Sequence, residues 1–125
     1  MARKHPKRTK GTFLALPHYL IRHQNFGNLS GNAVKLLIEL GKEYNSYNNG
    51  DFSATYSTLK KRGWKSKGTI SRSISELIET GFIIKTRQGG KHRCNLYAIT
   101  MWAIDECNGK LDVMHSKTAS NEWKN

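Results

Sequence analysis

Residues 66–93, SKGTISRSISELIETGFIIKTRQGGKHR, decide the fold, because a helix signal, an apolar strand signal and a basic loop with two glycines follow one another directly. Ser66 is a suitable N-cap residue, and apolar residues then recur at helical spacing as far as Ile78. Gly81 suits the left-handed position that ends many helices. We therefore predict a helix over residues 67–80.

Two β-type runs, FIIKT and CNLYAIT, come next and flank the basic loop RQGGKHR. A short glycine-containing loop between two such runs is typical of a β-hairpin. We predict the tip of this hairpin at Gly89–Gly90.

The stretch LSGNAVKLLIELGKEYN, residues 29–45, has the clearest amphipathic pattern upstream of this unit. Ser30 is placed to cap a helix there, with one apolar stripe facing the core. We expect the opposite Lys/Glu face to lie in solvent. That face carries Lys35, Glu39, Lys42 and Glu43.

Between these two helices, Ser53 is placed to cap a second helix over residues 54–62, which Gly63 ends. A tight turn through Trp64, which we expect in the core, joins it to the third helix. Helix, tight turn, helix and hairpin in this order are the elements of a winged helix-turn-helix. The sequence thus predicts an α+β fold, with a three-helix core and a β-hairpin wing.

The length of 125 residues fits a single domain. We expect a basic flexible arm at residues 1–10, the winged helix-turn-helix domain at residues 11–103, and a C-terminal extension at residues 104–125. The sequence indicates no role for the extension, which lacks the heptad pattern of a dimerising coiled coil.

Positive charge is concentrated in two parts of the chain. The net charge is +12, from 21 Lys and Arg against 9 Asp and Glu. Residues 1–10 carry +5 and residues 55–93 carry +8, whereas residues 11–54 are neutral and residues 94–125 carry −1. Small domains typically carry a net charge of about 2–8. This localised excess indicates a polyanionic partner, of which nucleic acid is the commonest.

In a helix-turn-helix pair, the later of the two helices, here the one predicted at residues 67–80, places its first turns in the major groove of DNA. In the predicted helix 67–80, the outward side is small, polar or cationic in its N-terminal half. The residues that we assign to base reading are Lys67, Thr69, Ser71, Arg72 and Ser75. Arg72 is the leading base contact because a guanidinium can donate two hydrogen bonds to guanine. An intrahelical ion pair with Glu76 is the alternative.

The remaining cations are assigned to the DNA backbone and the minor groove. Contacts to phosphates near the turn are expected from Lys60, Lys61, Arg62 and Lys65. The wing residues, for the backbone or a narrow minor groove, are Arg87, Gln88, Lys91, His92 and Arg93. The arm residues, for a minor groove, are Arg3, Lys4, Lys7, Arg8 and Lys10. The alternatives are a solvated charged face, a plain polar hairpin and a solubilising tail.

The arrangement in SATYSTLKKRGWKSKGTISRSISELIETGFIIKTRQGGKHRCNLYAIT resembles the winged helix-turn-helix family. More narrowly, residues 12–104 resemble small bacterial and phage proteins in which LPHYL, LSGNAVKLLIEL, a YN…NNGD turn, a GW turn and LYAIT recur. The resemblance implies duplex DNA binding by the third helix and wing, in transcriptional control or in replication of phages and plasmids. It places Lys67, Thr69, Ser71, Arg72 and Ser75 on the reading helix, and Arg87, Lys91 and Arg93 on the wing.

Other chemistry finds little support in the sequence. Cys94 and Cys107 do not make a disulfide framework, and neither a signal peptide nor a membrane span is evident, so we expect a reduced, cytoplasmic, nucleoid-associated location. Zinc-site spacing is missing among His92, Cys94, Cys107 and His115. Without a GxxxxGK[ST] loop or a nucleophile beside a base, we expect no cofactor, no metal and no enzymatic activity.

The leading hypothesis is therefore a sequence-specific double-stranded DNA-binding protein, as a transcriptional regulator or a replication protein. A protein-interaction module that docks on a protein or nucleoprotein complex is the main alternative, and RNA binding is another. Since one winged helix reads only a few base pairs, a homodimer or repeated sites are expected for useful specificity.

Overall fold

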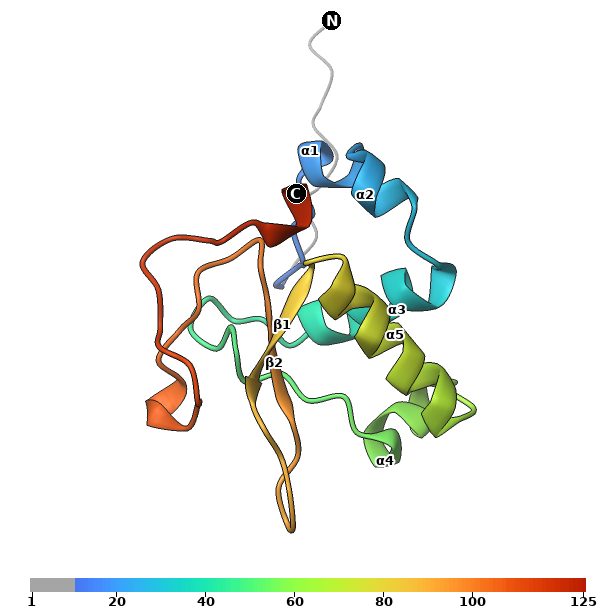
Figure 1. The fold of residues 1–125 in the computed structure, drawn as a ribbon, viewed down its shortest axis with the longest axis vertical. Coiled ribbons are helices and arrows are strands. Elements are labelled where there is room, and N and C mark those ends of the chain that lie inside the picture. Colours follow the sequence, from blue (N-terminus) through green and yellow to red (C-terminus); the bar gives the residue numbers. More distant parts are fainter. Residues whose placement is uncertain (1–10) are drawn as a thin grey trace, which may run out of the picture.

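The computed structural model describes residues 11–125, so the predicted arm lies outside the described residues. This part of the chain is α+β, with five α-helices and one antiparallel sheet of two strands. Within residues 11–125, every helix is too short or too polar to cross a membrane. The elements in Figure 1 are α1 (His18–Ile21), α2 (Gln24–Gly27), α3 (Gly31–Gly41), α4 (Tyr56–Leu59), α5 (Lys67–Glu79), β1 (Ile83–Arg87) and β2 (Leu96–Ile99), and the 3₁₀ turns are η1 (Lys60–Arg62), η2 (Cys107–Gly109) and η3 (Glu122–Lys124).

The two longer helices begin where the sequence predicts. Ser30 caps α3, since its Oγ accepts a hydrogen bond from the N–H of Ala33 at 3.1 Å. Ser66 caps α5 in the same way, and its Oγ accepts from the N–H of Thr69 at 3.1 Å. Gly81 follows α5 with a φ of +84°. Local capping chemistry therefore sets both ends of the predicted reading helix.

The second helix differs from the prediction at its start. Phe52 forms a bridge with Tyr97, in which the Tyr97 N–H donates to Phe52 O at 2.8 Å. Residues 53–55 lie outside any helix, and Thr55 is extended, so Ser53 is not the cap and α4 begins after Thr55. The predicted segment 54–62 thus becomes one short turn of α-helix followed by η1.

The tip of the hairpin lies two residues beyond the predicted glycine pair. Gly90 and Arg93 exchange backbone hydrogen bonds at 3.0 and 3.2 Å, which leaves Lys91 and His92 as the tip. Gly89 has a different role, because a Cβ there would lie 2.7 Å from the backbone oxygen of Arg93. Gly89 therefore permits the close approach of the opposite strand and does not form the turn itself.

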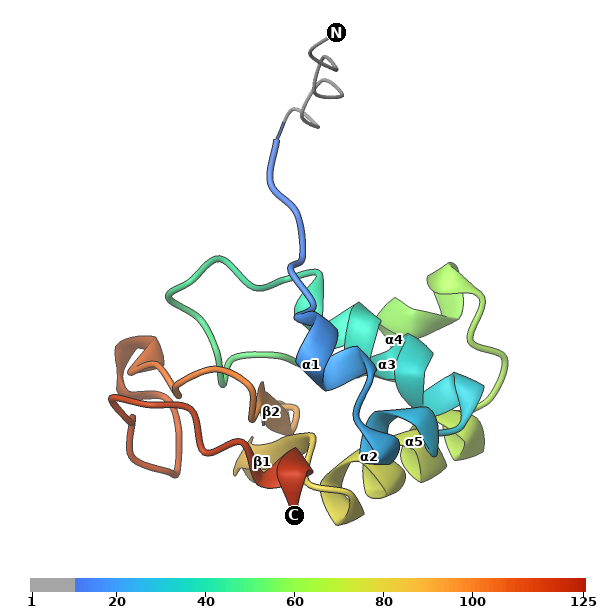
Figure 2. The ribbon, with the colours of Figure 1, turned by 90° about the horizontal axis from the view of Figure 1, so that it is seen from above.

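The hairpin lies between two layers. Helices α3 and α5 pack together and against one side of the strands, whereas the C-terminal segment covers the other side (Figures 1 and 2). Trp64 is buried as the sequence predicts. The fully buried side chains of this core include Leu36, Leu37, Leu40, Phe52, Leu77, Phe82, Ile83 and Ile99.

The C-terminal residues 104–125, predicted as an extension of unknown role, contribute Trp123 to the core of the domain. Trp123 is only 1% exposed and belongs to the same buried cluster as α3 and β1. Its ring stacks on Phe82 with a centroid distance of 5.9 Å, and the His23 ring stands nearly perpendicular to it with a centroid distance of 5.2 Å. Asn25 Nδ2 donates to the Trp123 carbonyl at 2.7 Å. The chain therefore ends against α1 and α2 (Figure 1).

A buried amide joins the loop after α3 to the end of β2. The Asn49 side chain is 0% exposed, and its Oδ1 accepts from the Ile99 N–H at 2.9 Å. Its Nδ2 donates to the carbonyls of Ile99 at 2.9 Å, Trp102 at 3.2 Å and Ala103 at 2.9 Å. These bonds satisfy a buried polar group and fix the loop after α3 to the end of β2.

Replacing Trp123 by alanine should lower the free energy of unfolding by about 3–5 kcal/mol, because a cavity would open against Phe82. Denaturant unfolding measures this change. The control is Lys124→Ala at the exposed neighbouring position, with an expected change within about 0.5 kcal/mol. Equal and small effects of both substitutions would show that the C-terminal segment adds nothing to the core.

Candidate nucleic-acid interface

One glycine shapes the connection between α4 and α5. The turn η1 ends at Gly63, whose φ is +89°, a value that disfavours residues with a side chain. The N–H of Trp64 donates to the Leu59 carbonyl at 3.3 Å and closes the turn. The chain therefore passes directly from the lysines of η1 into the N-terminus of α5.

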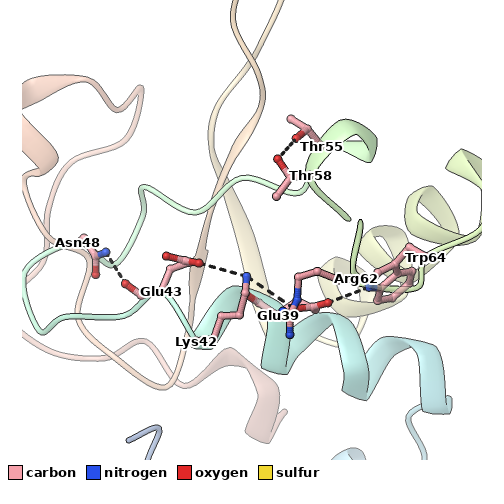
Figure 3. Close-up of polar contacts among 8 residues, drawn as sticks. All are labelled: Glu39, Lys42, Glu43, Asn48, Thr55, Thr58, Arg62 and Trp64. Carbon is pink, nitrogen blue, oxygen red and sulfur yellow. Dashed lines mark hydrogen bonds and ion pairs between the residues drawn. The ribbon is translucent and has the colours of Figure 1, made fainter. Parts of the chain in front are cut away.

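Glu39 ties this turn to α3, and its burial corrects the expectation of a solvated Lys/Glu face. The residue is 5% exposed. Its Oε1 accepts from Arg62 Nε at 2.6 Å, and its Oε2 accepts from Trp64 Nε1 at 3.1 Å (Figure 3). Lys42 Nζ lies 3.6 Å from Oε1. These donors replace the water that the carboxylate loses, which is why α3 tolerates it inside the fold.

The protonation of Glu39 follows from the same contacts. Burial alone raises the pKa of its carboxyl, but the hydrogen bonds from Arg62 and Trp64 and the charges of Arg62 and Lys42 outweigh burial, and the pKa lies below its usual value. The carboxylate is therefore ionised at neutral pH, and its charge contributes to the stability of the turn.

A second carboxylate joins α5 to α3. Glu76 Oε2 accepts from the N–H of Ser30 at 2.8 Å, and Glu76 Oε1 accepts from Ser30 Oγ at 2.7 Å. An acidic group at a helix N-terminus is also favoured by the helix dipole. Among the ion pairs of residues 11–125, none joins Glu76 to Arg72, the alternative that the sequence left open. Glu76 is thus turned towards α3.

Arg72 lies over the first turn of α5. Its Nη2 donates to Thr69 Oγ1 at 3.3 Å, and that oxygen is 2.8 Å from Ser66 Oγ. A Cβ on Gly68 would lie 3.1 Å from Arg72 Nη1, so the glycine leaves room for the guanidinium. Of the residues predicted to read bases, Thr69 is half-buried, and the exposed ones are Lys67, Ser71, Arg72 and Ser75.

The cations near the turn lie on η1, on the connection that follows it and at the start of α5. Lys60 Nζ and Lys67 Nζ both lie over the Tyr56 ring, 6.0 and 5.9 Å from its centroid. Arg62 is bound to Glu39, yet its side chain remains 52% exposed. The four residues assigned to phosphates are all exposed: Lys60, Lys61, Arg62 and Lys65.

The hairpin residues separate into a structural arginine and an exposed group. Arg87 is half-buried, its Nη2 donates to the Cys94 carbonyl at 2.9 Å, and its Nε is buried without a hydrogen-bond partner among the described residues. Arg87 therefore braces the two strands rather than projecting from the tip. Of the predicted wing residues, the exposed ones are Gln88, Lys91, His92 and Arg93.

A groove of about 520 Å³ separates α5 from the hairpin. Its lining includes Ile74 and Ile78 of α5, the latter 38% exposed, together with Lys67 and Lys85. Lys85 was not among the predicted site residues. The two-residue alternation of β1 could have found it, because Lys85 shares the strand face of Ile83, the face that packs towards α5.

The α4–α5 connection and the hairpin tip lie at one end of the molecule, and α1 and the C-terminus lie at the other (Figure 1). The structure therefore brings the predicted reading helix, the turn cations and the hairpin to the same end. The arm residues Arg3, Lys4, Lys7, Arg8 and Lys10 lie outside the described residues.

The candidate ligands for a metal remain apart in the part of the chain that the structure describes, where no group of three or more His, Cys, Asp and Glu could hold an ion. Cys94 is half-buried and Cys107 is buried, and burial raises the pKa of the Cys107 thiol. Neither cysteine forms a disulfide.

Comparisons of the chain with protein-family models, with curated proteins and with solved structures find no match. A functional conclusion therefore depends on how the chain's own side chains are arranged.

Replacing Glu39 by glutamine should lower the free energy of unfolding at neutral pH by about 1.5–3 kcal/mol, because Arg62 and Trp64 lose a charged acceptor. The native pKa of Glu39 lies below the unfolded value, so its ionised form stabilises the native protein above about pH 4.3. That contribution is lost as the pH falls through the native pKa. Denaturant unfolding at a series of pH values measures it.

The control for this experiment is Glu43→Gln, because the Glu43 side chain is 64% exposed. It should change the free energy of unfolding by no more than about 0.5 kcal/mol. If wild type and Glu39→Gln lost stability in parallel on acidification, Glu39 would not be the group that carries this part of the pH dependence.

Proposed function

We propose that the chain is a winged-helix protein that binds double-stranded DNA, as a transcriptional regulator or replication-associated protein of a bacterium, phage or plasmid. The observation that carries this proposal is the exposed side of α5. In its first half this side presents Lys67, Ser71 and Arg72, while the nearer acid, Glu76, is turned away to Ser30. Such a surface can approach the floor of a major groove without repelling phosphates.

Exposed lysines on both sides of α5, placed to contact phosphates, support the same proposal. Lys60, Lys61 and Lys65 precede the helix, and Lys91 stands at the tip of the hairpin, which acts as the wing. The first N–H groups of α5 also favour an anion. With about six phosphates neutralised, the logarithm of the association constant should fall with the logarithm of salt concentration with a slope near −5.

The groove between α5 and the wing suits a DNA strand that passes from the major to the minor groove. Lys67 and Lys85 would contact its phosphates, and the apolar Ile74 and Ile78 would face the sugars. This adds Lys85 to the residues that position the duplex. Among the described residues, the Arg72 side chain has a single hydrogen bond, to Thr69 Oγ1, so it can rotate towards a base edge.

A protein-interaction module is the second candidate, and the exposed Ile78 in the same groove is the observation that favours it. An acidic segment with apolar residues would satisfy both the isoleucines and the lysines there. For DNA, one such domain reads only a few base pairs, so we propose a homodimer or repeated sites as the source of specificity.

The experiment that tests the proposal is selection of random-sequence duplex DNA by the purified protein at about 150 mM salt. We expect an enriched motif, and a preference for duplex DNA over duplex RNA at the same salt. An inverted repeat within the motif would indicate a symmetric dimer. If no sequence were enriched and binding vanished with salt, DNA recognition would be rejected in favour of the protein-partner candidate.

Replacing Arg72 by alanine should cost about 1–3 kcal/mol on the selected site and should relax the preference at one base pair. Replacing Lys85 by alanine should weaken all sequences alike and reduce the salt slope by about 0.9. Both are measured by fluorescence anisotropy against matched and mutated sites.

The matched control is Arg22→Ala, which removes the same charge from the exposed end of α1, at the opposite end of the molecule (Figure 1). It should leave both affinity and preference close to wild type. Unchanged base preference in Arg72→Ala would remove Arg72 from the reading residues.

A further inference from the structure

The outer edge of β1 is bound by a residue of the C-terminal segment. The N–H of Asp112 donates to the Thr86 carbonyl at 2.7 Å, and Asp112 Oδ2 accepts from the N–H of Gln88 at 2.8 Å. One residue thus satisfies a carbonyl and an amide on the same strand edge, as a neighbouring strand would. These contacts lie where the hairpin leaves the core and extends towards its tip.

The segment that carries Asp112 is itself anchored on the body of the domain. Lys110 Nζ lies 2.9 Å from Asp51 Oδ2. Leu111 packs on Gly50, where a Cβ would lie 2.7 Å from Leu111 Cδ1, and Thr86 Oγ1 donates to the Gly50 carbonyl at 2.6 Å. Asp112 therefore connects the hairpin to a fixed point rather than to a free loop.

The hairpin needs such a support at this position. The register of β1 and β2 shifts between Lys85 and Arg87, and a bulge of this kind bends a strand and redirects the residues beyond it. Thr86 and Gln88, the residues that Asp112 binds, lie on either side of Arg87. Asp112 thus holds the strand at the irregularity, through Thr86, and just beyond it on the side of the tip, through Gln88.

Asp112 also lies close to a cation of the proposed wing. Its Oδ1 is 3.9 Å from Arg93 Nη2, and that nitrogen donates to the Gln88 carbonyl at 3.3 Å. Both side chains are about half exposed, so water screens this ion pair and its contribution is small. The hydrogen bonds to the strand edge are the stronger link.

We propose that Asp112 is a positioning residue that fixes the direction of the hairpin, so that Lys91 and His92 reach DNA while α5 lies in the adjacent groove. This inference rests on the proposed function. By this inference the C-terminal segment, for which the sequence indicates no role, sets the direction of the wing. Asp112 acts through the hairpin and does not itself contact DNA, whose phosphates would repel its charge.

Two substitutions separate positioning from charge. Asp112→Asn keeps an oxygen that can accept from the Gln88 N–H but removes the charge beside Arg93. Asp112→Ala removes both. We expect Asp112→Ala to bind the selected duplex about tenfold more weakly, a loss of about 1.4 kcal/mol, with a salt slope smaller by about 0.9 for each wing phosphate lost. Asp112→Asn should bind within about threefold of wild type.

A double substitution provides the readout that a general loss of stability would not change. Lys91→Ala should weaken binding in the wild-type background and have a clearly smaller effect in the Asp112→Ala background, because the displaced wing no longer makes that contact. Glu122→Ala, which removes an exposed acid from the same segment near the C-terminus, controls for the change in net charge. Tighter binding by both Asp112 variants would overturn the proposal and show that the Asp112 charge mainly repels the DNA.

Amide hydrogen exchange tests the structural step without DNA. In Asp112→Ala the Gln88 amide and the hairpin tip should exchange faster, while amides of α3 keep their protection. Unchanged exchange at the hairpin would also overturn the proposal. If the wild-type protein showed no salt-dependent affinity for any duplex, the proposed function would fail, whereas the exchange result would still decide whether Asp112 positions the hairpin.

Discussion

The buried carboxylate of Glu39 is the constraint on which the candidate interface depends. It comes from α3, the helix at the centre of the core, and it binds Arg62 and Trp64, the residues on either side of Gly63. An ionised group is tolerated in such a place only when donors replace its water. The turn must therefore bring both donors to one point, and the direction in which α5 leaves the turn follows from that requirement.

Glu76 applies the same principle further along α5, because its carboxylate binds the N-terminus of α3 at Ser30. Both acids count against a basic surface when charges are summed along the sequence. In the fold both are committed to internal contacts, and the exposed side of the first half of α5 is left with cations and hydroxyls. The two carboxylates that fix α5 in place thus also leave its outer side more favourable to a polyanion than the net charge alone indicates.

The predictable parts of the fold are those that local chemistry determines. Ser30, Ser66 and Gly81 act within one helical turn of their own positions, and the sequence places both long helices correctly through them. Glu39 lies at the edge of an apolar stripe, and nothing near it in the sequence indicates that Arg62, 23 residues later, donates a hydrogen bond to it. The prediction of the hairpin tip is wrong for a related reason. Gly89 is required by the close approach of the opposite strand and not by the turn. Which cations share one end of the molecule is likewise a property of the packing.

The C-terminal segment shows most clearly that contacts between distant residues are not predictable from local sequence patterns. It has almost no regular secondary structure, so neither helical nor strand periodicity marks it as part of the domain. The contacts that hold it include the buried indole of Trp123 and backbone hydrogen bonds to Thr86 and Thr100. Each of these bonds joins residues that are far apart in sequence and leaves no pattern within the segment. A segment whose sequence resembles a tail can therefore complete the core at one end of the molecule. Through Asp112 it also supports the hairpin, which is proposed to contact the duplex at the other end.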